Sequence, residues 1–300
     1  MTKIAIIAGI SGQDGFYLSK KLLKKKYKII GLSRKKINQK KIKIIKTRYS
    51  YKELVKIIKK YKPNVIYNLA GESNPRISWK KINETQKSII NLTINFLEAI
   101  RKYSIKTKYF NSSTSEIYGT KKKKINEKDK FNPTNPYGCF KTTSHLLVKI
   151  YRDTHKIFAV NGVLFNHDSI KRPKGFLIRE ILDYCISKNK NNFKLVLQEP
   201  HAIRDYAHAE DIVEGIYKIM NLKNPDDYII CGGTVRNVKE ITYQFFNRFR
   251  INKNKLVFLN NKKTNRINKK IGNNNKLKRI TRWYPKYKEN KLIEKLAREV

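Results

Sequence analysis

The sequence predicts an α/β fold in which a doubly wound parallel sheet is followed by a smaller C-terminal part. Short apolar runs alternate with helical patterns through the first half of the 300 residues. A glycine turn with the spacing G-x-x-G-x-x-G directly follows the first of these runs. Beyond residue 165 the predicted elements become shorter and their loops longer, which indicates a change of organisation.

The first unit of the chain is an apolar run, a glycine turn and a helical pattern. The run Ile4–Ala8 is short enough to be a buried parallel strand, and apolar residues recur at helical spacing from Phe16 to Leu23. Glycines also occur in ordinary turns, so the flanking strand and helix give the motif its meaning. Together they predict the first βα unit of a Rossmann fold, in which backbone N–H groups at a helix N-terminus approach a pyrophosphate. The predicted cofactor-binding residues of this turn are Gly9, Ser11, Gly12, Gln13, Asp14 and Gly15.

The following elements continue the alternation. Strands are predicted at 27–32, 42–46, 64–69, 108–112 and 158–165. Helices are predicted at 51–61, around 89–100, and from 136 to about 150. This order implies right-handed crossovers, a parallel sheet, and ligands beyond the carboxyl ends of the strands. Leu69, Ala70 and Gly71 lie at such an end and join the predicted cofactor-binding residues.

The second half is predicted to be mainly a substrate-binding part. Its predicted elements are helices at 176–187, 209–220 and 238–249, and strands at 193–198, 228–230 and 256–259. We therefore expect residues 1–165 to form the dinucleotide-binding domain and 166–300 the substrate-binding part, with some segments returning to the first domain. The Lys/Asn-rich run 260–278 is expected to be a surface loop.

The charge and the cysteines bound the class of protein. The formal net charge is +45, which raises the alternative of a nucleic-acid-binding protein. The lysines are scattered over almost every predicted surface, so we expect no specific nucleic-acid partner, only attraction of anionic molecules. Three distant cysteines suggest neither a disulfide framework nor a zinc site. The first strand leaves no room for a signal peptide and no run is long enough for a membrane span, so a cytoplasmic protein is expected.

The end of the second predicted strand indicates which nicotinamide cofactor binds. An acidic residue about 20 residues after the glycines usually binds the ribose hydroxyl of NAD. Here the strand ends in the run Gly31–Lys36, which contains no carboxylate. Arg34 and Lys35 stand where they could hold a 2′-phosphate instead, so NADP is predicted. Because any loop of so basic a chain would contain lysine or arginine, the absence of an acidic residue is the stronger evidence for NADP.

Tyr137 and Lys141 are the predicted chemical pair. They are four residues apart behind an Asn135–Pro136 helix start, so they share one helix face. A lysine ammonium beside a phenol lowers its pKa, and such a tyrosine can take a proton from a sugar hydroxyl as hydride leaves the same carbon. The spacing alone is common on amphipathic helices. His167 and Asp168 lack a third ligand, so they are interpreted as structural and no metal is predicted.

Six stretches carry a resemblance to a known family: Gly9–Gly15, Tyr67–Ala70, Ser113–Gly119, Asn135–Tyr137 with Lys141, Asn161–His167 and Arg204–Ala209. In these stretches the chain resembles the extended short-chain dehydrogenase/reductases, and most closely the GDP-mannose 4,6-dehydratase group. The resemblance spans residues 1 to about 215 and fades toward Val300. It implies an enzyme that oxidises a nucleotide-sugar at C4, removes water across C5 and C6, and returns the hydride to C6.

The resemblance also implies roles for individual residues. Thr114, beside Ser115, would hydrogen-bond the sugar 4-hydroxyl, and Tyr137 would be the base that Lys141 activates. Glu116 would be the acid/base of water removal, although a plain surface glutamate before a turn is the alternative. The residues implied to contact the nucleotide-sugar are Asn166, Arg179, Arg204 and, by a looser match, Arg266.

Some departures from the family leave alternatives open. The stretch after Arg34 is shorter than in the family, where a longer loop supports a tetramer, so a homodimer is as strong an expectation as a homotetramer. Lys46–Arg48 stands where the family usually has an aspartate near adenine. A reductase or epimerase on the same scaffold would need Tyr137 and Lys141 but not Glu116. The resemblance does not decide the nucleobase or the sugar.

Overall fold

The main sheet of the protein has seven parallel strands in the order β10-β6-β5-β4-β1-β2-β3. A computed structural model describes residues 2–121, 123–190, 192–259 and 268–300. The reversal of strand order about β1 confirms the predicted doubly wound parallel sheet. The strands are β1 (Ile4–Ala8), β2 (Lys28–Ser33), β3 (Lys43–Lys46), β4 (Val65–Asn68), β5 (Lys108–Thr114), β6 (Ala159–Leu164) and β10 (Asp227–Ile230).

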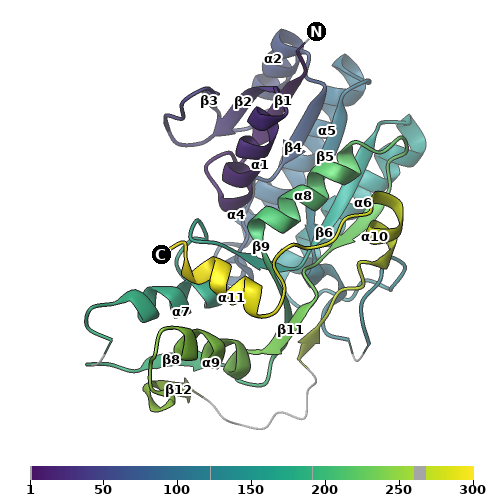
Figure 1. Ribbon diagram of the computed structural model, residues 1–300. Coiled ribbons are helices and arrows are strands. Elements are labelled where there is room, and N and C mark those ends of the chain that lie inside the picture. The colour runs from purple at the N-terminus through teal and green to yellow at the C-terminus, as the bar shows by residue number, and fades with distance from the viewer. Residues whose placement is uncertain (1, 122, 191, 260–267) are drawn as a thin grey trace.

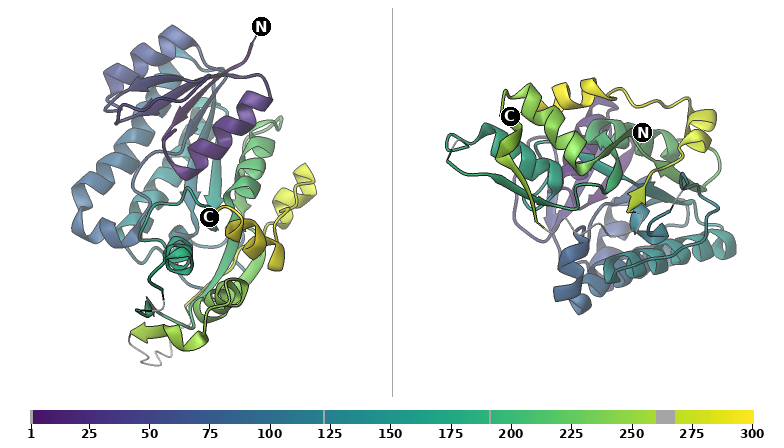
Figure 2. Two further views of the ribbon diagram at one scale, coloured as in Figure 1. Left: turned by 60° about the vertical axis from the view of Figure 1, so that its left-hand side comes forward. Right: turned by 90° about the horizontal axis from the view of Figure 1, so that it is seen from below.

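Helices cover both faces of this sheet, as Figures 1 and 2 show. On one face lie α1 (Gln13–Lys24) and α8 (Ala209–Met220), which pack against each other. On the other lie α2 (Tyr51–Tyr61), α5 (Leu92–Tyr103) and α6 (Pro136–His155). No helix in the described part of the chain is both long and apolar enough to cross a membrane.

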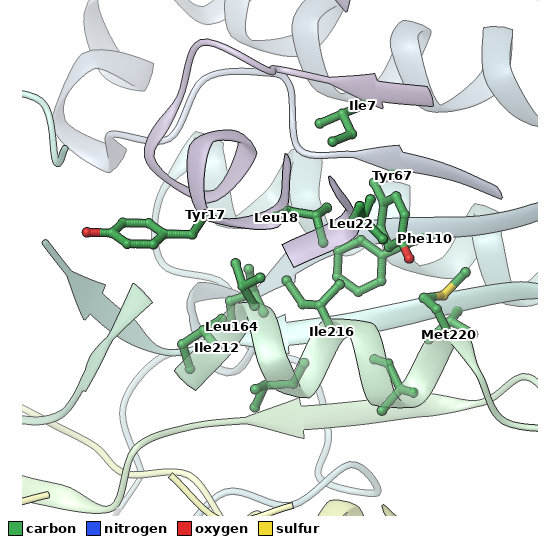
Figure 3. Close-up of a cluster of buried hydrophobic side chains, with 14 of the residues drawn as sticks. Ile7, Tyr17, Leu18, Leu22, Tyr67, Phe110, Leu164, Ile212, Ile216 and Met220 are labelled. Atoms are coloured by element: carbon green, nitrogen blue, oxygen red, sulfur yellow. The ribbon is translucent and has the colours of Figure 1, made fainter. Parts of the chain in front are cut away.

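The core between α1, α8 and the sheet is aromatic at its centre. Figure 3 shows Leu18 and Leu22 of α1 and Ile216 of α8 converging on Tyr67 and Phe110 of the sheet. All five side chains are almost completely buried. Burying an apolar side chain of this size stabilises the fold by about 1.5–3 kcal/mol, so this layer fixes the sheet that carries the site.

Local sequence signals account for the helix ends that were predicted best. Ser50 and Glu53 form a reciprocal capping box at the start of α2, whose ends match the prediction. Helix α8 also begins and ends at the predicted residues. The predicted helix around 89–100 differs, because a π-helical turn at Lys87–Asn91 separates α4 (Ile82–Gln86) from α5. A single helical period does not reveal that extra residue per turn.

A second, smaller body lies beyond the carboxyl ends of the main strands (Figures 1 and 2). Its central strand is β9, which pairs with three short strands. These four strands are β7 (Asn166–Asp168), β9 (Ile203–His208), β11 (Thr234–Asn237) and β13 (Lys269–Lys270). The rest of the body comprises α7 (Leu177–Ile186), β8 (Leu195–Gln198), α9 (Val238–Arg248), β12 (Leu256–Leu259) and α11 (Asn290–Ala297).

Two segments connect the smaller body with the main sheet. After β9 the chain returns to the main sheet as α8 and β10, and β10 pairs with β6. At the other end of the chain, the Glu299 carboxylate accepts hydrogen bonds from Tyr17, His208 and the Ile170 N–H. Burial alone would raise the pKa of Glu299, but these donors lower it to about 2. The C-terminus therefore binds both bodies.

The expectation of a surface loop at 260–278 is wrong for its described residues. Residues 269–270 form β13 beside β9, and residues 275–278 are the first part of α10 (Asn275–Thr281). The Lys270 side chain is buried. This strand could not be predicted from the sequence, because two residues are too few to show a periodic pattern.

Candidate active site

The glycine turn between β1 and α1 leaves no room for a side chain at Gly9 or at Gly15. Gly9 has φ +81°, and a Cβ there would lie 2.7 Å from the Leu69 carbonyl oxygen. A Cβ on Gly15 would lie 2.5 Å from the Gly9 carbonyl oxygen. Gly12 is the N-cap of α1, whose first N–H groups have no acceptor within the helix. A backbone cradle of this kind at a helix N-terminus fits the pyrophosphate of a dinucleotide.

The side chains of Gln13 and Asp14 point to the segment after β6. Gln13 Nε2 donates to the His167 carbonyl at 3.1 Å, and Ser169 Oγ donates to Gln13 Oε1 at 2.9 Å. His167 Nε2 lies 3.0 Å from Asp14 Oδ1. Burial opposes both charges, yet the pair lowers the pKa of Asp14 and raises that of His167. These side chains join the two bodies, so contacts of Gln13 and Asp14 with a cofactor would come from their backbone.

Arg34 and Lys35 lie immediately after β2, and both are exposed. The Lys35 N–H donates to Ser33 Oγ at 3.1 Å, which fixes the start of this turn. Beside it, Tyr49 donates its hydroxyl to the Leu32 carbonyl at 2.9 Å. The same hydroxyl accepts from the Gly9 N–H at 3.3 Å. Arg34 and Lys35 therefore lie at the carboxyl ends of the strands, as the glycine turn does.

The carboxyl end of β4 lies beside the carboxyl end of β1, where the glycine turn begins. The Leu69 N–H donates to the Ala8 carbonyl at 3.0 Å, which holds the strand end against β1. Leu69, Ala70 and Gly71 are each partly exposed. A Cβ on Gly71 would lie 2.9 Å from the Ser88 carbonyl oxygen of the π-helical turn. Leu69 and Ala70 thus border the cradle at Gly9, and Gly71 packs against the π-helical turn.

Tyr137 and Lys141 lie on one face of α6, as predicted. The Asn135 side chain caps this helix by accepting from the Gly138 N–H at 2.8 Å. Both Tyr137 and Lys141 are buried, and Lys141 Nζ lies 5.9 Å from the centre of the tyrosine ring. Lys141 donates to the Ser112 carbonyl at 2.6 Å, which directs its ammonium toward the end of β5.

The structure does not support the predicted low pKa of Tyr137. Burial raises the pKa of its phenol, and this effect outweighs the hydrogen bond with Thr114 and the charge of Arg172. Burial also lowers the pKa of Lys141 to about 8. A nearby positive charge alone would lower the pKa of the phenol, but the cost of removing a phenolate from water is the larger effect here.

Glu116 lies where β5 gives way to a short 3-10 helix, Ser115–Tyr118, and both of its carboxylate oxygens are occupied. Lys270 Nζ donates to Oε1, and Asn135 Nδ2 donates to Oε2 at 2.9 Å. Burial opposes the charged form, but Lys270 and Asn135, with the charge of Arg204, hold the pKa of Glu116 below its usual value. Glu116 is therefore a carboxylate in this structure. The alternative of a plain surface glutamate does not fit these contacts.

The start of α6 and the Glu116 backbone pack without a gap. A Cβ on Gly138 would lie 2.8 Å from the Glu116 carbonyl oxygen. The Glu116 N–H in turn donates to Thr114 Oγ1 at 3.3 Å, and Ser115 between them is buried. The structure thus brings together Thr114, Ser115, Glu116, Tyr137 and Lys141, all five of the predicted catalytic residues.

A buried polar network behind the site was not predicted. His145 of α6 lies 3.0 Å from Ser113 Oγ through Nδ1, and 3.2 Å from Asp227 Oδ2 through Nε2. Arg152 Nη1 donates to Asp227 Oδ1 at 2.8 Å. The network fixes β5 against α6 and β10.

In the described part of the chain, no group of three ligand-type side chains could hold a metal ion.

The predicted substrate residues differ in how free their side chains are. Asn166 is partly exposed at the start of β7, opposite Tyr206 of β9. Arg204 donates to the carbonyls of Ile203 and Asn268, and its charge acts on Glu116. Arg179 is paired with Asp183 at 2.7 Å on its own helix. Arg266 lies outside the described residues.

The family model of GDP-mannose 4,6 dehydratase matches residues 6–296 of the chain. The match covers the glycine turn, the Tyr137 helix and most of the smaller body. The chain belongs to the GDP-mannose 4,6-dehydratase family. The resemblance predicted from six short stretches is confirmed, and the match continues to residue 296, beyond residue 215, where the resemblance was expected to fade.

Individual members of this family are about one-third identical to the chain. GDP-mannose 4,6 dehydratase of Drosophila melanogaster is 33% identical over 267 residues, which cover 81% of this chain and 67% of the relative. The human GDP-mannose 4,6 dehydratase is 33% identical over 81% of this chain and 71% of its own length. GDP-mannose 4,6 dehydratase 2 of Arabidopsis thaliana is 29% identical over 99% of this chain and 86% of the relative.

Solved structures of low sequence identity share the fold. The dTDP-glucose 4,6-dehydratase of Bacillus anthracis, determined in complex with NAD, has a TM-score of 0.87 at 20% identity and covers 99% of this chain and 96% of its own. A UDP-glucose 4-epimerase of Thermotoga maritima, determined with UDP-glucose, has a TM-score of 0.88 at 17% identity, covering 99% and 98%. Dehydratases and epimerases thus share this architecture, and site residues must distinguish between them.

Proposed function

We propose that this chain is a nucleotide-sugar 4,6-dehydratase, a hydro-lyase of the extended short-chain dehydrogenase/reductases. Its proposed reaction converts GDP-mannose to GDP-4-dehydro-6-deoxy-mannose. One observation carries the proposal beyond family membership: the Glu116 side chain, paired with Lys270, stands against the start of the Tyr137 helix. A reductase or epimerase on this scaffold needs the tyrosine and lysine but no third proton-transfer group.

The glycine cradle supports a dinucleotide cofactor, which we propose is NADP. The backbone at Gly9, Ser11, Gly12, Gln13, Asp14 and Gly15 would hold the pyrophosphate, and Arg34 and Lys35 the 2′-phosphate. Leu69, Ala70 and Gly71 would border the same molecule. When bound, the cofactor supplies hydride acceptance at C4 of the sugar and hydride return at C6.

The proton steps fall to side chains from two elements. In the proposed reaction Tyr137 takes the proton of the sugar 4-hydroxyl, and Thr114, followed by Ser115, orients that hydroxyl. Lys141 keeps a positive charge within 6 Å of the tyrosine ring, which stabilises the phenolate as it forms. Glu116 takes the proton from C5 once C4 is a carbonyl.

The substrate is proposed to lie between the two bodies. Arg204 stands next to Glu116, and Asn166 follows the end of β6, so both are placed to contact a nucleotide-sugar. Arg179 would have to leave Asp183 to do so. Arg266 remains a prediction from the resemblance. The net charge of +45 attracts a diphosphate from a distance without selecting it.

The assembly is proposed to be a homodimer or homotetramer in the cytoplasm, without a specific nucleic-acid partner. Helix α3 (Pro75–Lys80) and helix α4 both pack against α6. On these helices Trp79, Ile82, Leu146 and Ile150 expose large apolar side chains, with Trp79 63% exposed. Large apolar side chains exposed on helices that pack together favour association of protein surfaces.

A panel of GDP-, dTDP-, UDP- and CDP-sugars tests the proposed function. Mass spectrometry after incubation with the enzyme and NADP should show loss of one water from GDP-mannose and from no other sugar of the panel. A product that differs in mass by two hydrogens would indicate a reductase, and an unchanged mass with altered sugar stereochemistry an epimerase. Either result would reject the dehydratase.

NADP should bind more tightly than NAD. Replacing Arg34 with alanine removes a charge-assisted hydrogen bond worth about 1.5–3 kcal/mol, so NADP affinity should fall about 10- to 100-fold while NAD affinity stays nearly unchanged. Titration of both cofactors by calorimetry measures this. Lys128→Ala, which removes a charge from a distant exposed loop, is the matched control. A wild-type preference for NAD would show that the basic turn reflects composition alone.

A further inference from the structure

The backbone around Lys270, in strand β13, is hydrogen-bonded to neighbouring segments on two sides. On one side Lys270 is paired in register with Arg204 of β9. On the other, the Lys121 N–H donates to the Lys269 carbonyl at 3.1 Å, and the Ile125 N–H donates to the Ile271 carbonyl at 2.8 Å. These bonds tie β13 to the loop that follows the Glu116 helix. The position of the lysine is therefore set by the fold rather than by its own flexible side chain.

The Lys270 side chain is 8% exposed and ends at Glu116. The charged and titratable groups around this pair come from three other elements. Arg204 of β9 acts on both members, Tyr137 of α6 lies within reach of the Glu116 charge, and Glu199 acts on Lys270. The uncharged Asn135 side chain holds the second carboxylate oxygen. Glu116 is thus held by two donors from segments far apart in the sequence.

Stability alone does not account for this ion pair. Removing two charges from water is costly, and a buried ion pair is often no more stable than apolar side chains of similar volume. A lysine is rarely buried unless something requires it. Here the partner of the buried lysine is the carboxylate on which the proposed elimination depends, and this suggests a role in that step.

We propose that Lys270 is a positioning residue that keeps Glu116 ionised and directed at the sugar carbon from which it removes a proton. The inference rests on the proposed function. In the elimination, the C5 proton moves to Glu116 and the C–H electron pair enters the C4 carbonyl as an enolate. The enolate then expels the C6 hydroxyl, which takes the proton from Glu116 and leaves as water. Glu116 is again a carboxylate beside Lys270, which keeps its own proton throughout.

The acid limb of the pH–kcat profile tests this role. Lys270→Met keeps the length of the side chain and removes its charge, so the pKa of Glu116 rises. A base works only above its pKa, and the acid limb of kcat for water loss should therefore move up by about one to three pH units. Lys270→Arg should return the limb close to its wild-type position. Lys269→Met, the neighbour whose side chain points to the other face of β13, is the matched control and should leave it unchanged.

A measurement that does not depend on turnover accompanies the kinetics. In protein labelled with ¹³C at the glutamate carboxyls, Glu116 is assigned by the loss of its resonance in Glu116→Gln. Its titration midpoint should rise in Lys270→Met and return in Lys270→Arg. An unchanged midpoint would overturn the inference, and so would a raised midpoint without a shift of the acid limb. Wild-type enzyme that dehydrates no nucleotide-sugar would instead reject the proposed function, and the absence of product would distinguish that failure.

Discussion

Replacing Tyr137 with phenylalanine is expected to lower kcat by about 10²- to 10⁴-fold, the usual contribution of a positioned proton-transfer group. The variant removes one hydroxyl from a buried ring whose backbone and neighbours stay in place, since the Tyr137 N–H still donates to Ser78 Oγ. Binding of NADP should persist, because the glycine cradle lies on a different element. Steady-state kinetics with GDP-mannose and a cofactor titration measure the two effects separately.

Tyr151→Phe is the matched control for this experiment. Tyr151 lies on the same helix, and its hydroxyl donates to Glu98 at 2.7 Å. Its removal should leave kcat within a few-fold of wild type. If Tyr137→Phe behaved in the same way, Tyr137 would not be the base, and the oxidation would have to be assigned to another residue.

Glu116→Gln is expected to lower the rate of water loss by about 10²- to 10⁴-fold while slow oxidation at C4 continues. Glutamine keeps the size of the side chain but cannot take the C5 proton. Oxidation without elimination should strand the hydride on the cofactor, so NADPH absorbance at 340 nm should accumulate to no more than one equivalent per site. Exposed Glu180 provides the control Glu180→Gln, which should have no effect.

The stability of Glu116→Gln needs a separate measurement. The substitution leaves Lys270 buried without its charged partner, which costs about 3–5 kcal/mol in comparable pairs. Thermal unfolding, with and without NADP, shows whether the variant is folded at the assay temperature. A folded Glu116→Gln enzyme that eliminates water at the full rate would contradict the assignment of Glu116.

The parts of the site that could be predicted from sequence are those built by local rules. The turn Gly9–Gly15 is recognisable because strand, glycines and helix follow one another directly. Tyr137 and Lys141 are recognisable because one turn of a helix places them on one face, behind a cap formed by Asn135. The order of elements was sufficient to predict the parallel sheet.

The unpredicted parts depend on contacts between distant segments. Lys270 and Glu116 are separated by 154 residues, and the chain around Lys270 looks like any other lysine-rich surface. Asp227 meets His145 across 82 residues, and only the pairing of β10 with β6 brings them together. Strands as short as β7 and β13 have too few residues to show a period of two.

The pKa of Tyr137 shows a further reason why prediction failed. A sequence shows that Lys141 is near, but it does not show how deeply both side chains are buried. Desolvation decides the direction of both shifts, because burial raises the pKa of the tyrosine and lowers that of the lysine.

The fate of the C4 hydrogen tests the central claim most directly. GDP-mannose deuterated at C4 should give a dehydrated product that carries the deuterium at C6, with no net formation or consumption of NADPH. Mass spectrometry with fragmentation of the sugar locates the label, and absorbance at 340 nm follows the cofactor. Transfer of the label to C6 is the result that an internal dehydratase requires. Stoichiometric consumption of NADPH, or a product that keeps deuterium at C4 or loses it to solvent, would contradict the proposed reaction.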